Sequence, residues 1–324
     1  MSIKSYMPQI TERDKQLLDM IIKFKMVSYD MARELYQNKW AIYKRINKLV
    51  KDGMLKKVGR NHITLGQVGI SFVNFEWYVN FEPLNNPTSK EMLYRWTKVV
   101  EIANREYIYP HFINCWDLKS ETRKQGNEMS DKNKILGVAR GYGIYKISKD
   151  TGMKTLSDLI TNIREATSHN IYDFIVFCET PEKIRDFLQV VEQVGKLMNI
   201  RRLHILPYTE SGLKIMDTII GIPDWKDKVV KVVYSDGVKA SSKNYAEYEW
   251  QGKEIYVGID TDLIGKEIIK AEQSIRGNMN LEILCIRGQE ERYKDLNLPV
   301  KTITMPEFLM AVGYKNNENR NEEE

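Results

Sequence analysis

The chain has 324 residues, of which 42% are hydrophobic and 29% charged, and these values are typical of a globular protein with two domains. No stretch approaches 18 uninterrupted apolar residues and the N-terminus has no apolar signal region, which argues against a membrane or secreted protein and predicts a cytoplasmic one. The 49 Lys and Arg residues nearly balance the 44 Asp and Glu residues. Residues 1–70, however, contain 14 basic residues against 6 acidic ones, so a basic N-terminal part precedes a near-neutral body.

Three segments with helical spacing of apolar residues follow one another between Ile10 and Leu65. They centre on residues 17–22, 31–35 and 40–50, and Gly53 ends the third. Two short apolar runs come next, separated by a Gly-Arg-Asn-His sequence. Three helices and a two-stranded ribbon are the plan of a winged helix-turn-helix, whose helix and ribbon tip fit into DNA grooves. We therefore predict an N-terminal DNA-binding domain over residues 1–82.

The third helix and the ribbon carry most of the basic residues of this domain. Ile42, Ile46 and Leu49 recur at the spacing of one helix face and are expected to point into the core. The other face would enter a major groove and the ribbon would contact the DNA backbone or minor groove. A charge run often marks only a solvated face, but here charge and element order agree. The predicted DNA-binding residues are Lys39, Tyr43, Lys44, Arg45, Asn47, Lys48, Lys56, Lys57 and Arg60; Trp40 fits either the core or a DNA contact.

The segment after the ribbon leads to a domain boundary. Residues 66–69 are predicted to form a turn, and the aromatic stretch 72–81 fits a strand or a helix. Pro83 and Asn85-Asn86-Pro87 break the chain. An amphipathic helix then begins at Lys90 and extends to about Tyr107; it suits either a dimer contact or packing on the following domain.

Beyond Pro110 the sequence predicts an α/β body over residues 88–314, which includes the amphipathic helix. Continuous apolar strands alternate with helices, and this pattern predicts a mostly parallel sheet flanked by helices. The expected strands are 142–147, 172–178, 203–206, 228–234, 248–250, 254–259, 281–286 and 300–304. Residues 315–324 contain no apolar side chain and are predicted to be a disordered tail.

No phosphate-binding loop, nucleophile elbow or metal-binding histidine cluster occurs in the chain, so we predict no catalytic residue, no metal and no cofactor. Asp260 and Asp262 end a predicted strand and could hold Mg²⁺ for DNA cleavage, although either could instead cap the helix that begins near Leu263. Cys178 lies at a strand-to-helix turn without a partner base. The three cysteines, Cys115, Cys178 and Cys285, show no paired spacing.

The first 70 residues resemble the replication-relaxation family, which consists of proteins of plasmids, phages and conjugative elements in bacteria. The resemblance lies in an opening T-x-R-D sequence and in an R-I-x-x-L-x-x-x-G-x-L segment, followed by a glycine after the wing strand. The matching residues are Thr11, Arg13, Asp14, Arg45, Ile46, Leu49, Gly53, Leu55 and Gly69, while Thr64 and Leu65 stand in reversed order.

The resemblance implies sequence-specific binding to double-stranded DNA at a replication or transfer origin, as initiator or accessory factor. Implied partners are a second copy of the chain and a replication, partition or transfer protein. Two alternatives remain open. One is a transcriptional regulator with a ligand- or partner-binding α/β domain, and the other is a metal-dependent DNA nuclease.

Overall fold

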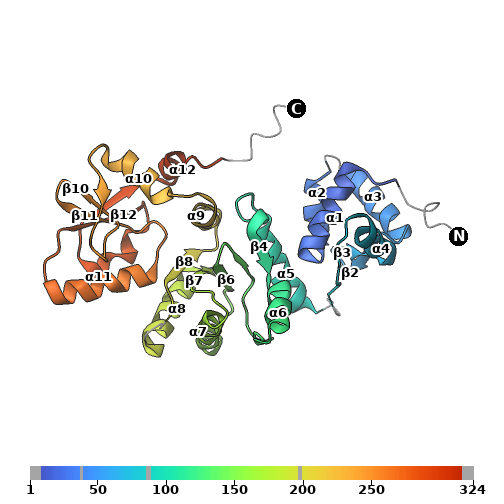
Figure 1. Ribbon diagram of the computed structural model, residues 1–324, viewed down its shortest axis with the longest axis horizontal. Helices are drawn as coiled ribbons and strands as arrows, with labels where there is room; N and C mark the ends of the chain where they lie inside the picture. The colour runs from blue at the N-terminus through green and yellow to red at the C-terminus, as the bar shows by residue number, and fades with distance from the viewer. Residues whose placement is uncertain (1–8, 37–38, 85–88, 196–198, 316–324) are drawn as a thin grey trace. The chain divides into compact units, whose positions relative to one another are not determined.

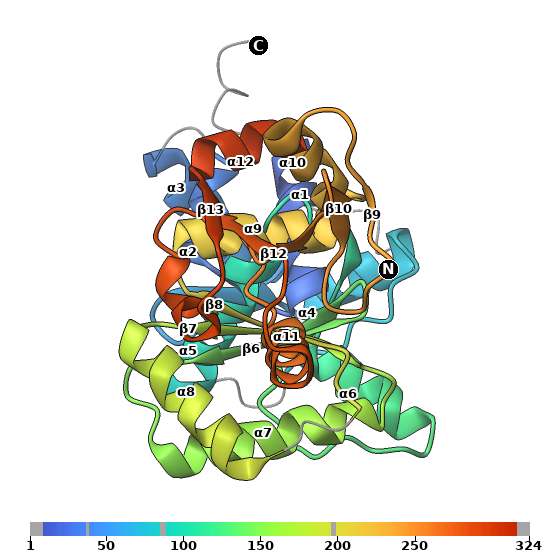
Figure 2. The ribbon, with the colours of Figure 1, turned by 90° about the vertical axis from the view of Figure 1, so that its left-hand side faces the viewer.

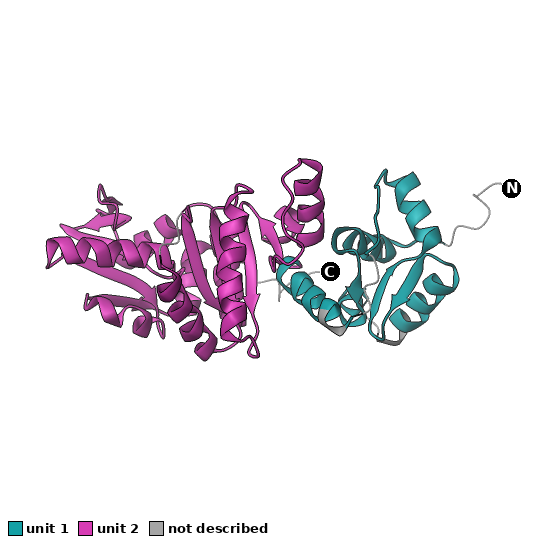
Figure 3. Cartoon of the chain, turned by 90° about the horizontal axis from the view of Figure 1, so that it is seen from below, with its two compact units in different colours: residues 1–103 teal, residues 104–324 magenta. Residues whose placement is uncertain are grey.

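The computed structural model describes residues 9–36, 39–84, 89–195 and 199–315. The chain has a mixed α/β fold and forms two compact units, residues 1–103 and 104–324 (Figure 3). The first unit contains a small sheet, and the second contains two larger ones. Among the described residues, no helix has the length and apolar character needed to cross a membrane.

The first unit begins with three helices and a hairpin in the predicted order (Figure 1). Its small sheet is antiparallel, with strand order β1-β3-β2. Ile42, Ile46 and Leu49 are buried, which confirms the predicted core face of the third helix. The elements are α1 (Glu12–Phe24), β1 (Val27–Ser28), α2 (Tyr29–Glu34), α3 (Lys39–Lys51), β2 (Leu55–Val58), β3 (His62–Leu65), α4 (Gln67–Glu76) and α5 (Lys90–Ala103).

The turn predicted at residues 66–69 is wrong, because α4 begins at Gln67 and extends through half of the aromatic stretch. Two glycines allow this helix to start against the end of α3. A Cβ atom at Gly66 would lie 2.2 Å from the carbonyl oxygen of Gly53, and one at Gly69 would lie 2.1 Å from that of Met54. The pattern of turn-forming residues therefore reflects close backbone packing rather than a turn.

Replacing Gly69 with alanine is expected to destabilise the first unit by about 1–3 kcal/mol, because the new methyl group would overlap a backbone oxygen that cannot rotate away. Gly126→Ala is expected to add only backbone strain, about 1 kcal/mol, because its backbone is left-handed (φ +74°) while a Cβ atom there meets nothing within 4 Å. Urea unfolding of the full chain measures both effects. An unchanged midpoint for Gly69→Ala would contradict the packing role.

Helix α5 packs on the first unit, so the predicted boundary at residues 82–88 lies inside this unit. Trp96 is fully buried, and its ring meets Phe24 of α1 edge-on at 6.5 Å and His62 of β3 at 6.4 Å. The imidazole of His62 also contacts the hydroxyl of Thr97 at 3.3 Å. The amphipathic face of α5 is thus used within the first unit, a possibility that its spacing alone did not indicate.

The first sheet of the second unit has five strands in the order β4-β5-β6-β7-β8. Pairing is antiparallel from β4 to β6 and parallel from β6 to β8. Helices α7 and α8 lie on one face of this sheet and α9 on the other (Figure 1). The elements are β4 (Phe112–Asn114), α6 (Cys115–Lys124), β5 (Gly137–Ala139), β6 (Tyr142–Ile147), α7 (Met153–Thr167), β7 (Asp173–Cys178), α8 (Pro181–Val194), β8 (Arg202–Pro207) and α9 (Glu210–Gly221).

The second sheet also has five strands, in the order β13-β12-β11-β10-β9. Pairing is antiparallel from β9 to β11 and parallel from β11 to β13. Figure 2 shows α11 below this sheet and α10 and α12 above it. The elements are α10 (Trp225–Tyr234), β9 (Lys239–Ala240), β10 (Tyr248–Trp250), β11 (Lys253–Val257), α11 (Leu263–Arg276), β12 (Leu281–Ile286), β13 (Val300–Ile303) and α12 (Met305–Val312).

Two predictions about this body are therefore wrong. It contains two mixed sheets rather than one mostly parallel sheet, because apolar runs indicate strands but not which strands pair or in which direction. The expected strand at residues 228–234 is helix α10. Val229 and Val230 are buried whereas the side chain of Val232 is exposed, and this arrangement follows a helical face despite the β-branched residues.

The loop after β11 joins the two sheets. The Thr261 hydroxyl donates to the carbonyl oxygen of Ile205 on β8 at 2.7 Å, and Asp262 forms an isolated antiparallel bridge with His204. Thr261 itself is buried with a left-handed backbone (φ +53°). This contact brings the carboxyl end of β11 beside the amino-terminal half of β8.

Candidate functional site

Four residues of the first unit form one polar cluster around a buried carboxylate, and this cluster joins α1 to α3. Asp14 is fully buried, and the Arg45 guanidinium donates to both of its carboxylate oxygens, with Nε at 2.9 Å from Oδ1. The Tyr36 hydroxyl donates to the same Oδ1 at 2.8 Å. Thr11 caps α1 in a reciprocal capping box with Asp14. The Asp14 carboxylate thus receives donors from three segments of the chain.

The electrostatics of Asp14 follow from these contacts. Burial raises the pKa of its carboxyl group, but hydrogen bonds from Arg45, Thr11 and Tyr36 outweigh burial and lower this pKa to about 2. The carboxylate is therefore charged at neutral pH, and the Arg45 guanidinium is its counter-ion. Three residues that carry the family resemblance, Thr11, Asp14 and Arg45, lie in this cluster.

The cluster separates Arg45 from the other predicted DNA-binding residues. Its guanidinium is held by Asp14 and by the carbonyl oxygen of Gln9, so it links α3 to α1 and to the segment before α1. The side chain of Lys39 lies outside the described residues, as does that of Trp40. The remaining predicted residues are exposed: Tyr43, Lys44, Asn47 and Lys48 on α3, Lys56 and Lys57 on β2, and Arg60 at the hairpin turn.

The exposed basic side chains keep their charge unneutralised. Lys51 of α3 joins this group, which we call the basic surface: Lys44, Lys48, Lys51, Lys56, Lys57 and Arg60. The ion pairs described in the first unit use Lys15, Arg33, Arg45 and Lys98 as their cations. Within the described part of the chain, no carboxylate lies within ion-pair distance of the basic surface. Such a surface attracts a polyanion through the release of its counterions.

Two uncharged side chains lie beside the basic surface. Tyr43 is 41% exposed and stacks on Tyr29 at the start of α2, with ring centroids 5.9 Å apart and planes at 20°. Asn47 is exposed one helical turn further along α3. An asparagine amide can pair with adenine in a major groove, whereas lysines mainly contact phosphates. The position of Tyr29 was not predicted, because helical spacing does not show which residues of different helices meet.

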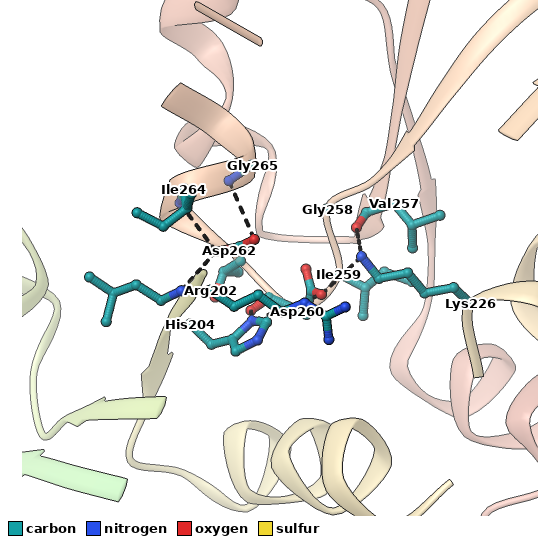
Figure 4. A network of polar contacts seen from close by, with 12 residues as sticks. Arg202, His204, Lys226, Val257, Gly258, Ile259, Asp260, Asp262, Ile264 and Gly265 are labelled. Carbon is teal, nitrogen blue, oxygen red and sulfur yellow. Dashed lines mark hydrogen bonds and ion pairs between the residues drawn. The ribbon is translucent and has the colours of Figure 1, made fainter. Parts of the chain in front are cut away.

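In the second unit the two predicted carboxylates have different roles (Figure 4). Asp262 caps α11 by accepting from the backbone amides of Ile264 and Gly265, as the capping alternative predicts. Asp260 is 3% exposed and pairs with Lys226 of α10 at 3.0 Å. No group of three or more His, Cys, Asp or Glu side chains among the described residues is arranged to hold a metal ion.

The turn at Cys178 is also structural. Burial raises the pKa of the Cys178 thiol to about 12, so the reactive thiolate is scarce at neutral pH. Glu179 pairs with Lys146, and Thr180 caps α8.

Comparison with family models, curated proteins and solved structures found no match to this chain. The candidate DNA-binding site is therefore inferred from the side chains of this chain and not from a related protein.

Proposed function

We propose that the first unit is a winged helix-turn-helix that binds double-stranded DNA in a sequence-specific manner. The observation that carries this proposal is the basic surface, six exposed cations without described ion-pair partners on α3 and the β2–β3 hairpin. The element order and the antiparallel strand order β1-β3-β2 support it. The ion pair between Asp14 and Arg45 also supports the proposal. It joins α1 to α3, and it leaves all six cations of the basic surface available for a ligand.

The polar face of α3 would lie in a major groove. Tyr43 and Asn47 would contact base edges there, and Lys44 and Lys48 would contact flanking phosphates. The hairpin would follow the backbone, with Arg60 at its turn reaching a minor groove. Gly59 allows this tight turn through its left-handed backbone (φ +58°).

We further propose that the chain acts at a replication or transfer origin of a mobile element, as an initiator or accessory factor. This step rests on the resemblance of residues 1–70 to the replication-relaxation family. The chain would act as a homodimer and recruit a replication, partition or transfer protein. A dimer of such units requires half-sites separated by whole helical turns of DNA.

Footprinting of the full chain on DNA from its own replicon is expected to show discrete protected repeats at an origin. Because phosphate contacts dominate affinity, the protection should weaken steeply between 50 and 200 mM salt, by roughly 10³-fold or more if six phosphates are contacted. A control with unrelated plasmid DNA measures nonspecific binding. Equal protection of both DNAs would contradict sequence-specific recognition.

A transcriptional regulator is the second candidate function, and a cavity in the second unit favours it, because ligand-responsive regulators need a binding site besides the DNA-binding unit. A regulator would protect a palindrome next to a promoter, and an origin factor would protect repeats at an origin. The same footprints therefore distinguish the two functions by the position and symmetry of the protected sites.

A further inference from the structure

The second unit contains a cavity of about 650 Å³ where its two sheets meet. This volume falls within the range of small-molecule sites. One wall comes from the amino-terminal ends of β6 and β8, with Tyr142 and Arg202, and another from the carboxyl end of β11 and the start of α10, with Asp260 and Lys226. Glu247, directly before β10, also lines the cavity.

Lys226 organises the acidic wall of the cavity. Its ammonium group donates to Glu247 at 2.6 Å and to the carbonyl oxygen of Val257 at 3.3 Å, and it pairs with Asp260 at 3.0 Å. These contacts use all three of its N–H groups. Burial lowers the pKa of Lys226, but Asp260 and Glu247 outweigh burial and raise it. Two carboxylates thus face one ammonium, so these three groups together carry one net negative charge.

One oxygen atom of the Asp260 carboxylate is available to accept a hydrogen bond (Figure 4). Its Oδ2 atom pairs with Lys226, whereas its buried Oδ1 atom has no hydrogen-bond partner within the described residues. Burial raises the pKa of Asp260, but Lys226 and His204 lower it below its ordinary value, so the carboxylate is charged. A buried charged oxygen without a donor is costly, and a bound donor would remove that cost.

The buried imidazole of His204 lies beside Asp260, with its Nδ1 atom 3.9 Å from the Asp260 Oδ2 atom. The same Nδ1 atom lies 3.0 Å from the carbonyl oxygen of Asp260. A carbonyl can only accept, so Nδ1 carries a proton and donates to it. The Asp260 Oδ1 atom therefore calls for a donor, and the His204 Nε2 atom is a second buried atom without a partner among the described residues.

Arg202 lines the same cavity and offers the complementary charge. The Arg202 guanidinium donates through Nη1 to the Tyr142 hydroxyl at 2.9 Å, and its other N–H groups have no hydrogen-bond partner among the described residues. A guanidinium with free donors is suited to a planar or tetrahedral oxyanion. Neighbouring Arg201 is instead paired with Asp173 in a two-point contact. Arg202 is therefore the better anchor for a bound anion.

We propose that this cavity binds a nucleotide whose base carries an amino group, with the amino group donating to Asp260 and the phosphate contacting Arg202. The volume exceeds what a small amino acid fills, and flat aromatic side chains line the remaining walls, where a base can stack. These side chains are Tyr142, Trp225, Tyr245, Tyr248 and Tyr256. The site lies wholly within residues 104–324 and does not depend on the proposed DNA contacts.

Two pairs of nucleotides test the proposal on the unaltered full chain. CMP and UMP differ at C4, where cytosine has an amino group and uracil a carbonyl, and at N3, where only uracil carries a proton. AMP and IMP differ in the same way at C6 and N1. By isothermal titration calorimetry, CMP or AMP is expected to bind about tenfold or more tightly than its counterpart, because a carbonyl would place its oxygen against the Asp260 carboxylate. Equal affinities within both pairs, or no nucleotide binding, would overturn the proposal.

Variants locate the site. Asp260→Asn is expected to abolish the preference for the amino form, and Arg202→Ala to weaken binding of the preferred nucleotide about tenfold or more. Arg202 is exposed, so its variant is informative even if Asp260→Asn fails to fold. Arg185→Ala on α8 is the matched control, since its side chain is 73% exposed and lies outside the cavity. Binding of inorganic phosphate or glutamine in preference to every nucleotide would show a different ligand and refute the proposal.

Discussion

Replacing Arg45 with alanine is expected to destabilise the first unit by about 3 kcal/mol, because it leaves the fully buried Asp14 carboxylate without its counter-ion. Tyr36 and Thr11 would still donate to this carboxylate, so we expect the lower end of the usual range for a broken buried pair. Hydrogen exchange of the full chain measures the effect locally. Amides of α1 and α3 should exchange roughly 150-fold faster than in the wild type.

Arg13→Ala is the matched control, since Arg13 is an exposed arginine one residue before Asp14. Its exchange rates should stay close to those of the wild type. Asp14→Asn should resemble Arg45→Ala, because it removes the charge that holds the guanidinium. Wild-type exchange in Arg45→Ala would contradict a stabilising role for the pair and return Arg45 to the set of candidate DNA contacts.

The same cluster predicts how stability depends on pH. The pKa of Asp14 is about 2 in the folded chain, below its ordinary value of 3.8. A lowered folded-state pKa means that the carboxylate contributes stability above pH 4 and loses this contribution as the pH falls from 4 towards 2. The loss amounts to about 2 kcal/mol. In Asp14→Asn this part of the acid destabilisation should be absent.

The double variant Lys44→Ala/Lys48→Ala is expected to weaken DNA binding about 30-fold at 0.15 M salt. Both side chains are exposed on α3 without described ion-pair partners, and each phosphate that a lysine neutralises steepens the salt dependence by about 0.9. The slope of log affinity against log salt should therefore decrease by about two. Fluorescence anisotropy with a labelled duplex, measured between 50 and 300 mM salt, gives both quantities.

A charge-matched control keeps this experiment specific. Lys154→Ala/Lys228→Ala removes two exposed lysines from the second unit and changes the net charge equally. Its affinity should stay within about twofold of the wild type, because neither lysine belongs to the basic surface. If both double variants lose affinity equally, the net charge of the chain and not the basic surface governs binding.

The two proposals are separable. The basic surface belongs to residues 1–103 and the cavity to residues 104–324. Loss of nucleotide binding in Arg202→Ala with normal DNA binding would concern the cavity alone, and the converse would hold for Lys44→Ala/Lys48→Ala. If a bound nucleotide changed the footprint on DNA, nucleotide binding and DNA binding would be coupled. This result would favour the regulator over the origin factor.

The sequence by itself determined much of the first unit. The spacing of Ile42, Ile46 and Leu49 placed α3 and its core face correctly, because a helix repeats every 3.6 residues and burial follows that repeat. The same periodicity predicted the exposed face that carries Lys44 and Lys48. In the second unit, the cap at Asp262 is a local hydrogen bond that the sequence indicates within a few residues.

Tertiary structure decided the rest, because those features depend on residues far apart in the chain. Arg45 looked like its lysine neighbours until Asp14, 31 residues away, proved to be its partner. The two mixed sheets depend on strand pairing, which apolar runs do not specify. The cavity likewise requires α10, β8 and the loop after β11 to meet. Periodicity reports which face of an element is buried, whereas only the folded chain shows what that face is buried against.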